Sequence, residues 1–129
     1  MKKNIPKLTF KEEEVMFLVW SAGKPVTALE LSKSGKLSIN SVKITIPRLL
    51  EKGFIEVTGF GYSGTTVART FQAKISAEEY AANQLGAMQS TILNFSTLNF
   101  VKQILKNNPE TLHDLHELEE MVQKLKEEE

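Results

Sequence analysis

The stretch LSINSVKITIPRLLEKGFIE, residues 37–56, contains a change of hydrophobic period that identifies the architecture of this chain. Ser38 can cap a helix, and apolar residues then recur at helical spacing until Gly53, where the helix is expected to end. After that glycine, residues 54–60 and 66–75 are rich in β-branched and aromatic side chains, with the glycine-rich sequence GFGYSG as the expected turn between them. The stretch therefore predicts a helix followed by a β-hairpin.

Two helices are expected before this one, because two capping boxes precede it. In a capping box, a Ser or Thr side chain and a Glu three residues later satisfy the first free amides of a helix. The pair Thr9 and Glu12 predicts a helix that runs to about Ala22. The pair Thr27 and Glu30 predicts a short helix that stops at the next glycine.

The apolar residues of the first helix surround it almost completely, so Met16, Phe17 and Trp20 are expected in the core. Three helices followed by a hairpin give the element order of a winged helix-turn-helix, in which the second and third helices form the helix-turn-helix and the hairpin is the wing. The expected fold is thus mainly α with a small β-hairpin, an α+β class. A winged helix-turn-helix DNA-binding domain over residues 1–75 is followed by a second domain over residues 76–129.

Residues 76–129 are expected to form a helical dimerisation domain. A capping box at Ser76 and Glu79 starts it, and apolar residues from Ala81 to Phe95 then recur at coiled-coil-like steps of four and three, a pattern that predicts a helix over this range. Asn108 can cap a further helix, with Pro109 at its first position. A segment of this size cannot bury two apolar stripes by itself, so a second copy of the chain is the expected partner, and packing on the winged helix is the alternative. The residues expected in the dimer contact are Leu85, Met88, Ile92, Phe95, Phe100, Ile104, Leu115, Leu118, Val122 and Leu125.

The net charge of zero conceals two parts of opposite sign. Residues 1–75 contain twelve Lys or Arg and six Glu, whereas residues 76–129 contain four Lys and ten Asp or Glu. A basic part joined to an acidic part suggests that one end of the chain binds a polyanion.

Several classes of protein are excluded by what the sequence lacks. The absence of cysteine excludes disulfides and thiolate metal sites and fits a reducing compartment, so the expected location is the cytoplasm. No apolar run is long enough for a signal peptide or a membrane span. There is no phosphate loop, no G-x-S-x-G motif and no cysteine nucleophile, so an enzyme is not expected. His113 and His116 have a spacing that can seat a metal ion, but nothing else supports a site, and neither a metal nor a cofactor is expected.

The polar side of the third helix is suited to the major groove of DNA. Asn40, Ile44, Arg48 and Glu51 lie opposite its apolar side, with Ser41 and Lys43 at the flanks. Asn can bond adenine, Arg can bond guanine or a phosphate, and an exposed Ile can contact a thymine methyl group. We therefore expect this helix to bind double-stranded DNA.

Two further features of the basic part bear on DNA binding. Pro47 lies within the third helix, where it removes a hydrogen bond and crowds the carbonyl of Lys43, so this helix is expected to be kinked or shortened. That change weakens the case for base contacts beyond the proline. Candidates for phosphate contacts are Lys33, Lys36, Lys43 and Lys52.

The sequence resembles the penicillinase repressor family of BlaI/MecI/CopY-type regulators. The resemblance is carried, in chain order, by LTFKEEEVMFLVW, PVTALEL, LSINSVKITIPRLLEKGFIE and ISAEEY. It implies a homodimeric winged-helix repressor that binds a palindromic operator, an inverted repeat in double-stranded DNA. The positions that approach DNA in the family correspond here to Ser38, Asn40, Ser41, Lys43, Ile44 and Arg48.

The resemblance also implies a mode of inactivation. Relatives that respond to antibiotics are cut by a regulatory protease at an Asn–Phe bond in the dimerisation helices. This chain has two such bonds, Asn94–Phe95 and Asn99–Phe100, and the sequence leaves the choice between them open. Either phenylalanine can instead be an ordinary interface residue.

Besides Pro47 in the third helix, two features depart from the family pattern. The cysteine-rich copper-binding tail of the metal-responsive relatives is missing, so copper is not the expected inducer. The wing lacks the basic residues usual in the family, which leaves Tyr62, Thr65 and Arg69 as its candidate contacts, made through hydroxyls and backbone amides as much as through charge. The alternative functions are a winged-helix protein-interaction module and a ligand-sensing regulator of another winged-helix family.

Overall fold

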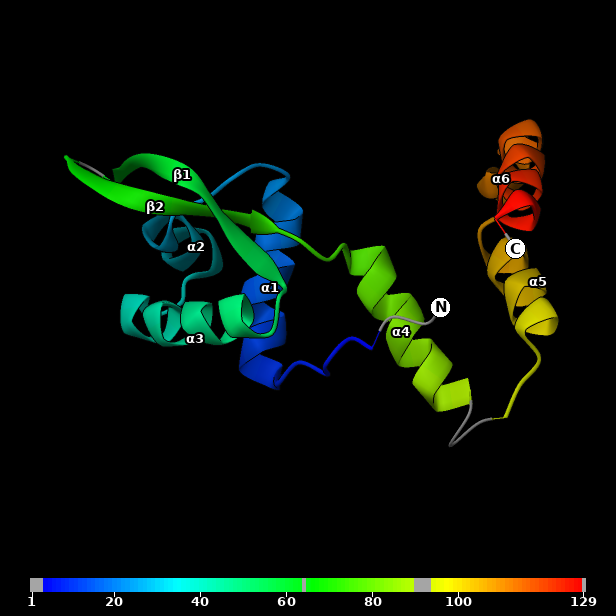
Figure 1. Cartoon of the computed structure of the whole chain (residues 1–129), viewed down its shortest axis with the longest axis horizontal. Helices are drawn as coiled ribbons and strands as arrows, with labels where there is room; N and C mark the ends of the chain where they lie inside the picture. The colour runs from blue at the N-terminus through cyan, green and yellow to red at the C-terminus, as the bar shows by residue number, and fades with distance from the viewer. Residues whose placement is uncertain (1–3, 64, 90–93, 129) are drawn as a thin grey trace. The chain divides into compact units, whose positions relative to one another are not determined.

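The computed structural model describes residues 4–63, 65–89 and 94–128. The chain forms two compact units, residues 1–86 and 87–129, and each is described by itself. The elements of the first unit are α1 (Phe10–Ala22), α2 (Ala28–Gly35), α3 (Ile39–Glu51), β1 (Ile55–Ser63), β2 (Thr66–Ala73) and most of α4 (Ala77–Met88). Those of the second unit are α5 (Thr97–Asn107), the 3₁₀ helix η2 (Pro109–Asp114) and α6 (Leu115–Glu127) (Figure 1).

The first two helices begin where their capping boxes predict. At the start of α1, the Thr9 side chain accepts a hydrogen bond from the Glu12 amide at 3.2 Å, and the Glu12 side chain accepts one from the Thr9 amide at 2.9 Å. Thr27 and Glu30 make the same pair of bonds at the start of α2, at 3.2 and 3.0 Å. Both predicted helix starts are confirmed, as is the end of α2 at Gly35.

The core of the first unit lies between the three helices and the base of the hairpin. Figure 1 shows α1, α2 and α3 on one side of the hairpin, whose far end extends past α2. The predicted element order, three helices and then a hairpin, is confirmed. The side chains buried in this core include Val15, Met16, Leu31, Val42, Leu49 and Phe54.

One core prediction on α1 is wrong. Met16 is fully buried, and Trp20 is half-buried with its indole N–H donated to the Ile75 carbonyl at 2.8 Å. The side chain of Phe17, by contrast, is 66% exposed. Because apolar residues surround this helix, their spacing does not indicate which of them faces the core; the elements that pack on α1, namely α2, α3 and β2, make that choice.

β1 and β2 form an antiparallel hairpin whose first strand is longer than expected. β1 continues to Ser63, which pairs with Thr66, so most of the segment GFGYSG belongs to the strand and its prediction as a turn is wrong. The pairing is irregular between Val57 and Gly59, and Gly59 has a φ of 153°, a value that L side chains rarely adopt. This glycine therefore serves a bulge inside the strand rather than a turn.

The start of α4 packs on the core of the first unit. Ser76 accepts a hydrogen bond from the Glu79 amide at 3.0 Å, as the capping pattern predicts. The Tyr80 ring is buried, with its centroid 6.0 Å from that of Trp20 and 5.5 Å from that of Phe54. The first unit thus extends past residue 76, and the domain division expected there stays a prediction.

The predicted continuation of the α4 stripe into Phe95 is wrong. α4 ends at Met88, and residues 94–96 form no helix. Ser96 then caps α5 by accepting a hydrogen bond from the Asn99 amide at 3.3 Å. A local cap therefore starts a new helix where the apolar spacing alone predicted a continuous one.

The connection between α5 and α6 also differs from the prediction. Pro109 starts a new element as expected, but this element is a 3₁₀ helix, and α6 begins only at Leu115. The Asn108 side chain makes no capping hydrogen bond to this element; its Nδ2 donates back to the Ile104 carbonyl of α5 at 2.9 Å.

The apolar side chains of the second unit are open to solvent. None of the side chains of α5, η2 and α6 is buried. Among the predicted dimer-contact residues, Leu115 and Val122 are each 54% exposed and Leu125 is 63% exposed. Ile92, another of them, lies outside the described residues.

Candidate DNA-binding surface

The exposed side of α3 carries most of the predicted DNA-binding residues. Its opposite side is buried against the core through Val42, Ile46 and Leu49, and α2 packs next to it. The polar side chains thus lie on a helix whose position is fixed by packing against the core. Five of the six predicted residues are exposed and Ser41 is half-buried; the exposed five are Ser38, Asn40, Lys43, Ile44 and Arg48.

Ile44 lies in the middle of this polar side. Its side chain is 59% exposed, and it is one helical turn from Asn40 and one from Arg48. In a major groove, an apolar side chain can contact a thymine methyl group. The amide and the guanidinium on either side of it can bond the edges of neighbouring bases.

Pro47 was expected to kink or shorten α3; it does not shorten the helix, and the kink stays a prediction. The helix runs over Ile39–Glu51 with the proline inside it. Pro47 is exposed, so water can bond the Lys43 carbonyl that the proline leaves without its usual amide donor. Arg48 therefore lies on a helix that continues past the proline.

The four lysines predicted to contact phosphates do not share one environment. Lys33, Lys36 and Lys43 are exposed. Lys52 is instead paired with Glu12, with 2.6 Å between its Nζ and Glu12 Oε1. The sequence analysis did not predict this pair, because it assigned Glu12 only to a capping box. The signal was a charged residue close to the apolar run of α1, since a buried charge requires a partner.

Glu12 is ionised inside the protein although its side chain is only 2% exposed. Burial by itself raises the pKa of its carboxyl. The hydrogen bonds from Lys52 and from the Thr9 amide, together with the positive charge of Lys52, outweigh that effect and hold the pKa below its ordinary value of 4.5.

Glu12→Gln is expected to lower the free energy of unfolding at neutral pH, and to do so less as the pH falls. Because the pKa of Glu12 is lower in the folded than in the unfolded protein, its carboxylate contributes to stability above the unfolded pKa, and this contribution is lost as the pH falls through the folded pKa. In urea denaturation from about pH 7 to about pH 3, the difference in free energy of unfolding between the wild-type protein and Glu12→Gln should therefore become smaller as the pH falls. A difference that stays constant over the range would contradict the ionised pair.

All three predicted wing contacts are exposed: Tyr62, Thr65 and Arg69. In the register of the hairpin, Phe60 is opposite Arg69, and Tyr62 is opposite Val67. Opposite residues of an antiparallel pair share a face, so Tyr62 and Arg69 lie on the same face of the wing. The Arg69 guanidinium is 5.3 Å from the centroid of the Phe71 ring, a cation–π distance.

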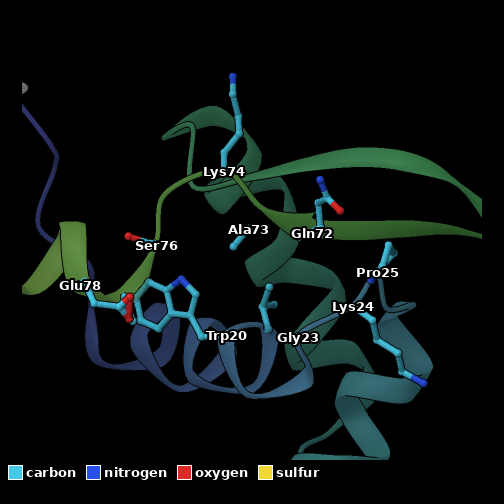
Figure 2. Close-up of a pocket in the computed structure, with 11 residues that line it drawn as sticks. Trp20, Gly23, Lys24, Pro25, Gln72, Ala73, Lys74, Ser76 and Glu78 are labelled. Atoms are coloured by element: carbon cyan, nitrogen blue, oxygen red, sulfur yellow. The ribbon is translucent and has the colours of Figure 1, made fainter. Parts of the chain in front are cut away.

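An open hollow of about 520 Å³ lies between the end of α1, the end of β2 and the start of α4 (Figure 2). Trp20, Ala73 and Ser76 line it. Figure 2 shows the side chains of Lys24 and Lys74 extending away from it, so these two charges do not converge on a bound group. Small-molecule sites combine an apolar wall with a few convergent polar groups, and the two lysines of this hollow do not supply such groups.

The fold and the exposed side of α3 define the class of this protein. Three helices and a hairpin, with a polar helix side free to enter a groove, make the first unit a winged helix-turn-helix domain. The sequence pattern of the penicillinase repressor family matches residues 8–124, and the chain belongs to this family. The protein is therefore a transcriptional regulator, a winged-helix DNA-binding repressor and not an enzyme. No curated protein matches the sequence.

Several solved structures are similar to this chain. ZitR of Lactococcus lactis, a zinc-responsive MarR family member, is 19% identical, with 85% of this chain and 80% of that chain covered and a TM-score of 0.46. The adhesin competence repressor AdcR of Streptococcus pyogenes is 20% identical, with 82% and 83% covered and a TM-score of 0.43. MepR of S. aureus, in a DNA-binding conformation, is 13% identical, with 84% and 80% covered and a TM-score of 0.41.

The part of the chain that the structure describes shows neither a cluster of metal-binding side chains nor a helix suited to a membrane. No group of three or more His, Cys, Asp or Glu side chains in that part is placed to hold a metal ion. His116 is instead paired with Glu120 at 3.0 Å. Within the same residues, no helix has both the length and the apolar composition that crossing a membrane requires.

Proposed function

We propose that two copies of this chain bind a palindromic operator, an inverted repeat in double-stranded DNA, and repress transcription there. The observation that carries the proposal is the exposed side of α3, with Asn40, Ile44 and Arg48 on successive turns opposite a buried side. In a helix-turn-helix, such a side enters the major groove. Lys43 and the hydroxyls of Ser38 and Ser41 stand beside it, where phosphate oxygens would lie.

We infer that the second unit makes the dimer contact. The stripe on α6, formed by Leu115, Leu118, Val122 and Leu125, remains half-buried or exposed within one chain. Continuous apolar surface of this kind marks an interaction site in a soluble protein, and a two-fold axis through it would present two equivalent half-sites to DNA. The proposed contact also includes Leu85, from the end of the first unit, and Met88, Phe95, Phe100 and Ile104. Met88 and Ile104 are exposed, and the other three side chains are half-buried.

Arg48→Ala is expected to weaken operator binding by about 1–3 kcal/mol, because it removes a base or phosphate contact from the middle of α3. The wild-type protein first selects its operator from a random pool of duplexes, and fluorescence anisotropy then compares the two proteins over a range of salt. Lys24→Ala is the matched control, since it removes an exposed positive charge from the α1–α2 connection. Failure to select any duplex, or binding that does not weaken as salt rises, would contradict the proposal. If the protein is instead a protein-interaction module, Arg48→Ala should still bind its protein partner.

We propose further that a regulatory protease inactivates the repressor at Asn94–Phe95 rather than at Asn99–Phe100. Two observations support this choice. Asn94 is exposed, outside any helix, and has a φ of 44°. Asn99, in contrast, lies in the first turn of α5, where the Ser96 side chain accepts its amide hydrogen bond. Proteases cut exposed non-helical segments most readily, because a helical bond must first unfold.

Limited digestion with chymotrypsin, used here as a probe that cuts after aromatic residues, is expected to cut after Phe95 before it cuts after Phe100. The order follows from the helix, which protects the second site and not the first. Mass spectrometry of timed samples identifies the two cuts, and Phe95→Ala should remove the earlier one. A first cut after Phe100 would contradict the choice of bond.

A further inference from the structure

Lys52, which ends α3, is held by two acceptors from the start of the chain. Its Nζ lies 2.6 Å from Glu12 Oε1 and 3.4 Å from the carbonyl oxygen of Lys7. The same Glu12 oxygen also accepts the hydrogen bond of the Thr9 amide at 2.9 Å. One buried carboxylate oxygen thus joins the first turn of α1 to the end of α3.

The peptide group between Lys7 and Leu8 is hydrogen-bonded on both sides. Its carbonyl accepts from Lys52, and its N–H donates to the Tyr80 hydroxyl at 3.0 Å. Tyr80 belongs to α4 and is 7% exposed, and its ring packs edge-on against Phe54, which follows the end of α3. The end of α3 is therefore linked through a single peptide group to α4 as well as through Glu12 to α1.

These contacts argue against a direct role for Lys52 on DNA. A charge-assisted hydrogen bond of 2.6 Å to a buried carboxylate is one of the stronger polar contacts in a protein, and a phosphate would have to compete with it. Moving the ammonium to DNA would also leave the Glu12 carboxylate buried without its cation, which is costly. The arrangement suits a lysine that holds the helix rather than one that leaves it.

We propose that Glu12, Lys52, the Lys7–Leu8 peptide and Tyr80 form a tether that sets the position of the end of α3, so that Glu12 and Lys52 are positioning residues for DNA binding and not DNA contacts. The inference rests on the proposed function, because it takes α3 as the helix that enters the major groove. Arg48 lies one helical turn before Lys52, so loosening the tether displaces this predicted contact first.

Glu12→Gln, Lys52→Met and the double variant test the tether in the full chain, with Lys43→Met as the control for loss of an exposed charge from α3. Operator affinity is measured between about 50 and 200 mM salt. Each single tether variant is expected to lower the affinity by roughly threefold to thirtyfold, as residues that act without touching the ligand do. The double variant should lose no more affinity than the single variant with the larger loss, because both substitutions remove the same interaction. The slope of log affinity against log salt should stay unchanged in all three, whereas Lys43→Met should flatten it by about 0.9 per copy, or about 1.8 for two copies on the operator.

Direct phosphate contact by Lys52 predicts the opposite result. Lys52→Met would then flatten the salt slope, and Glu12→Gln, which frees the ammonium, would strengthen DNA binding. Either result overturns the proposal, as do unchanged affinities of the two single variants or losses that add in the double variant.

Tyr80→Phe provides the test if circular dichroism shows that Glu12→Gln or Lys52→Met does not fold. It keeps the packed ring and removes only the hydroxyl, which accepts from the Leu8 amide at 3.0 Å and donates to Glu13 Oε2 at 3.5 Å. A lower affinity with an unchanged salt slope is then expected, and an unchanged affinity overturns the proposal.

The variants also distinguish failure of the tether from failure of the proposed function. If Lys43→Met and Arg48→Ala leave DNA binding intact as well, the proposed function itself fails. If these two variants weaken binding and the tether variants do not, the tether alone fails.

Discussion

Phe54→Ala is expected to lower the free energy of unfolding by about 3–5 kcal/mol, a large part of what a domain of this size possesses. The Phe54 side chain is fully buried where the end of α3, the hairpin and α4 meet, and its ring lies 5.5 Å from that of Tyr80. Its backbone amide also donates to the Leu49 carbonyl at 2.9 Å, which fixes the residue and limits how far the site can collapse. Truncation therefore leaves a cavity as well as removing an aromatic contact.

Urea denaturation monitored by the fluorescence of Trp20, the single tryptophan of the chain, measures this loss. Trp20 packs against Tyr80 and so reports on the same core. Phe60→Ala is the matched control: it removes the same atoms from β1, where the side chain is 73% exposed, and should change stability by no more than about 0.5 kcal/mol. Equal losses in the two variants would mean that the core does not form around Phe54.

Val122→Glu is expected to give a monomer with operator affinity lowered by about 10²-fold to 10⁴-fold. A dimer on two half-sites binds the second one as an intramolecular event, and this gain disappears when the two copies separate. Val122 lies in the middle of the α6 stripe and is 54% exposed in one chain, so a charge there opposes the dimer contact without unfolding the protomer.

Analytical ultracentrifugation measures the first effect, and titration of a full operator against a single half-site measures the second. Gln123→Glu adds the same charge on the polar side of α6 and should leave both unchanged. A Val122→Glu protein that stays dimeric would show that the contact lies elsewhere in the chain.

The helix starts could be predicted because each depends on residues close together in the chain. Thr9 with Glu12 and Thr27 with Glu30 close their hydrogen bonds within one turn, whatever the rest of the protein does. The exposed side of α3 was also predictable, because a single apolar side at helical spacing leaves only one direction for burial. Where apolar residues surround the helix, as in α1, the spacing carries no such direction, and Phe17 was misplaced.

The glycines of the wing show a different limit. GFGYSG has the composition of a turn, but cross-strand pairing carries β1 through it as far as Ser63. Glycine serves a bulge as well as a turn, so composition alone does not separate the two. At the junction after α4 the limit is similar: the apolar spacing fits one long helix, and the local cap at Ser96 starts a new one.

For this protein, the sequence alone was sufficient for the family, the order of the elements in the winged helix and the side of α3 that is exposed. These properties are encoded in neighbouring residues, through caps, periodicity and motif. The assignment of Lys52 required the folded chain. Its partners Glu12 and Lys7 are 40 and 45 residues away, and a buried carboxylate attracts whichever cation the packing brings within reach. Packing of the helices thus pairs a lysine that the sequence predicted as a phosphate contact with a buried carboxylate, at the end of α3.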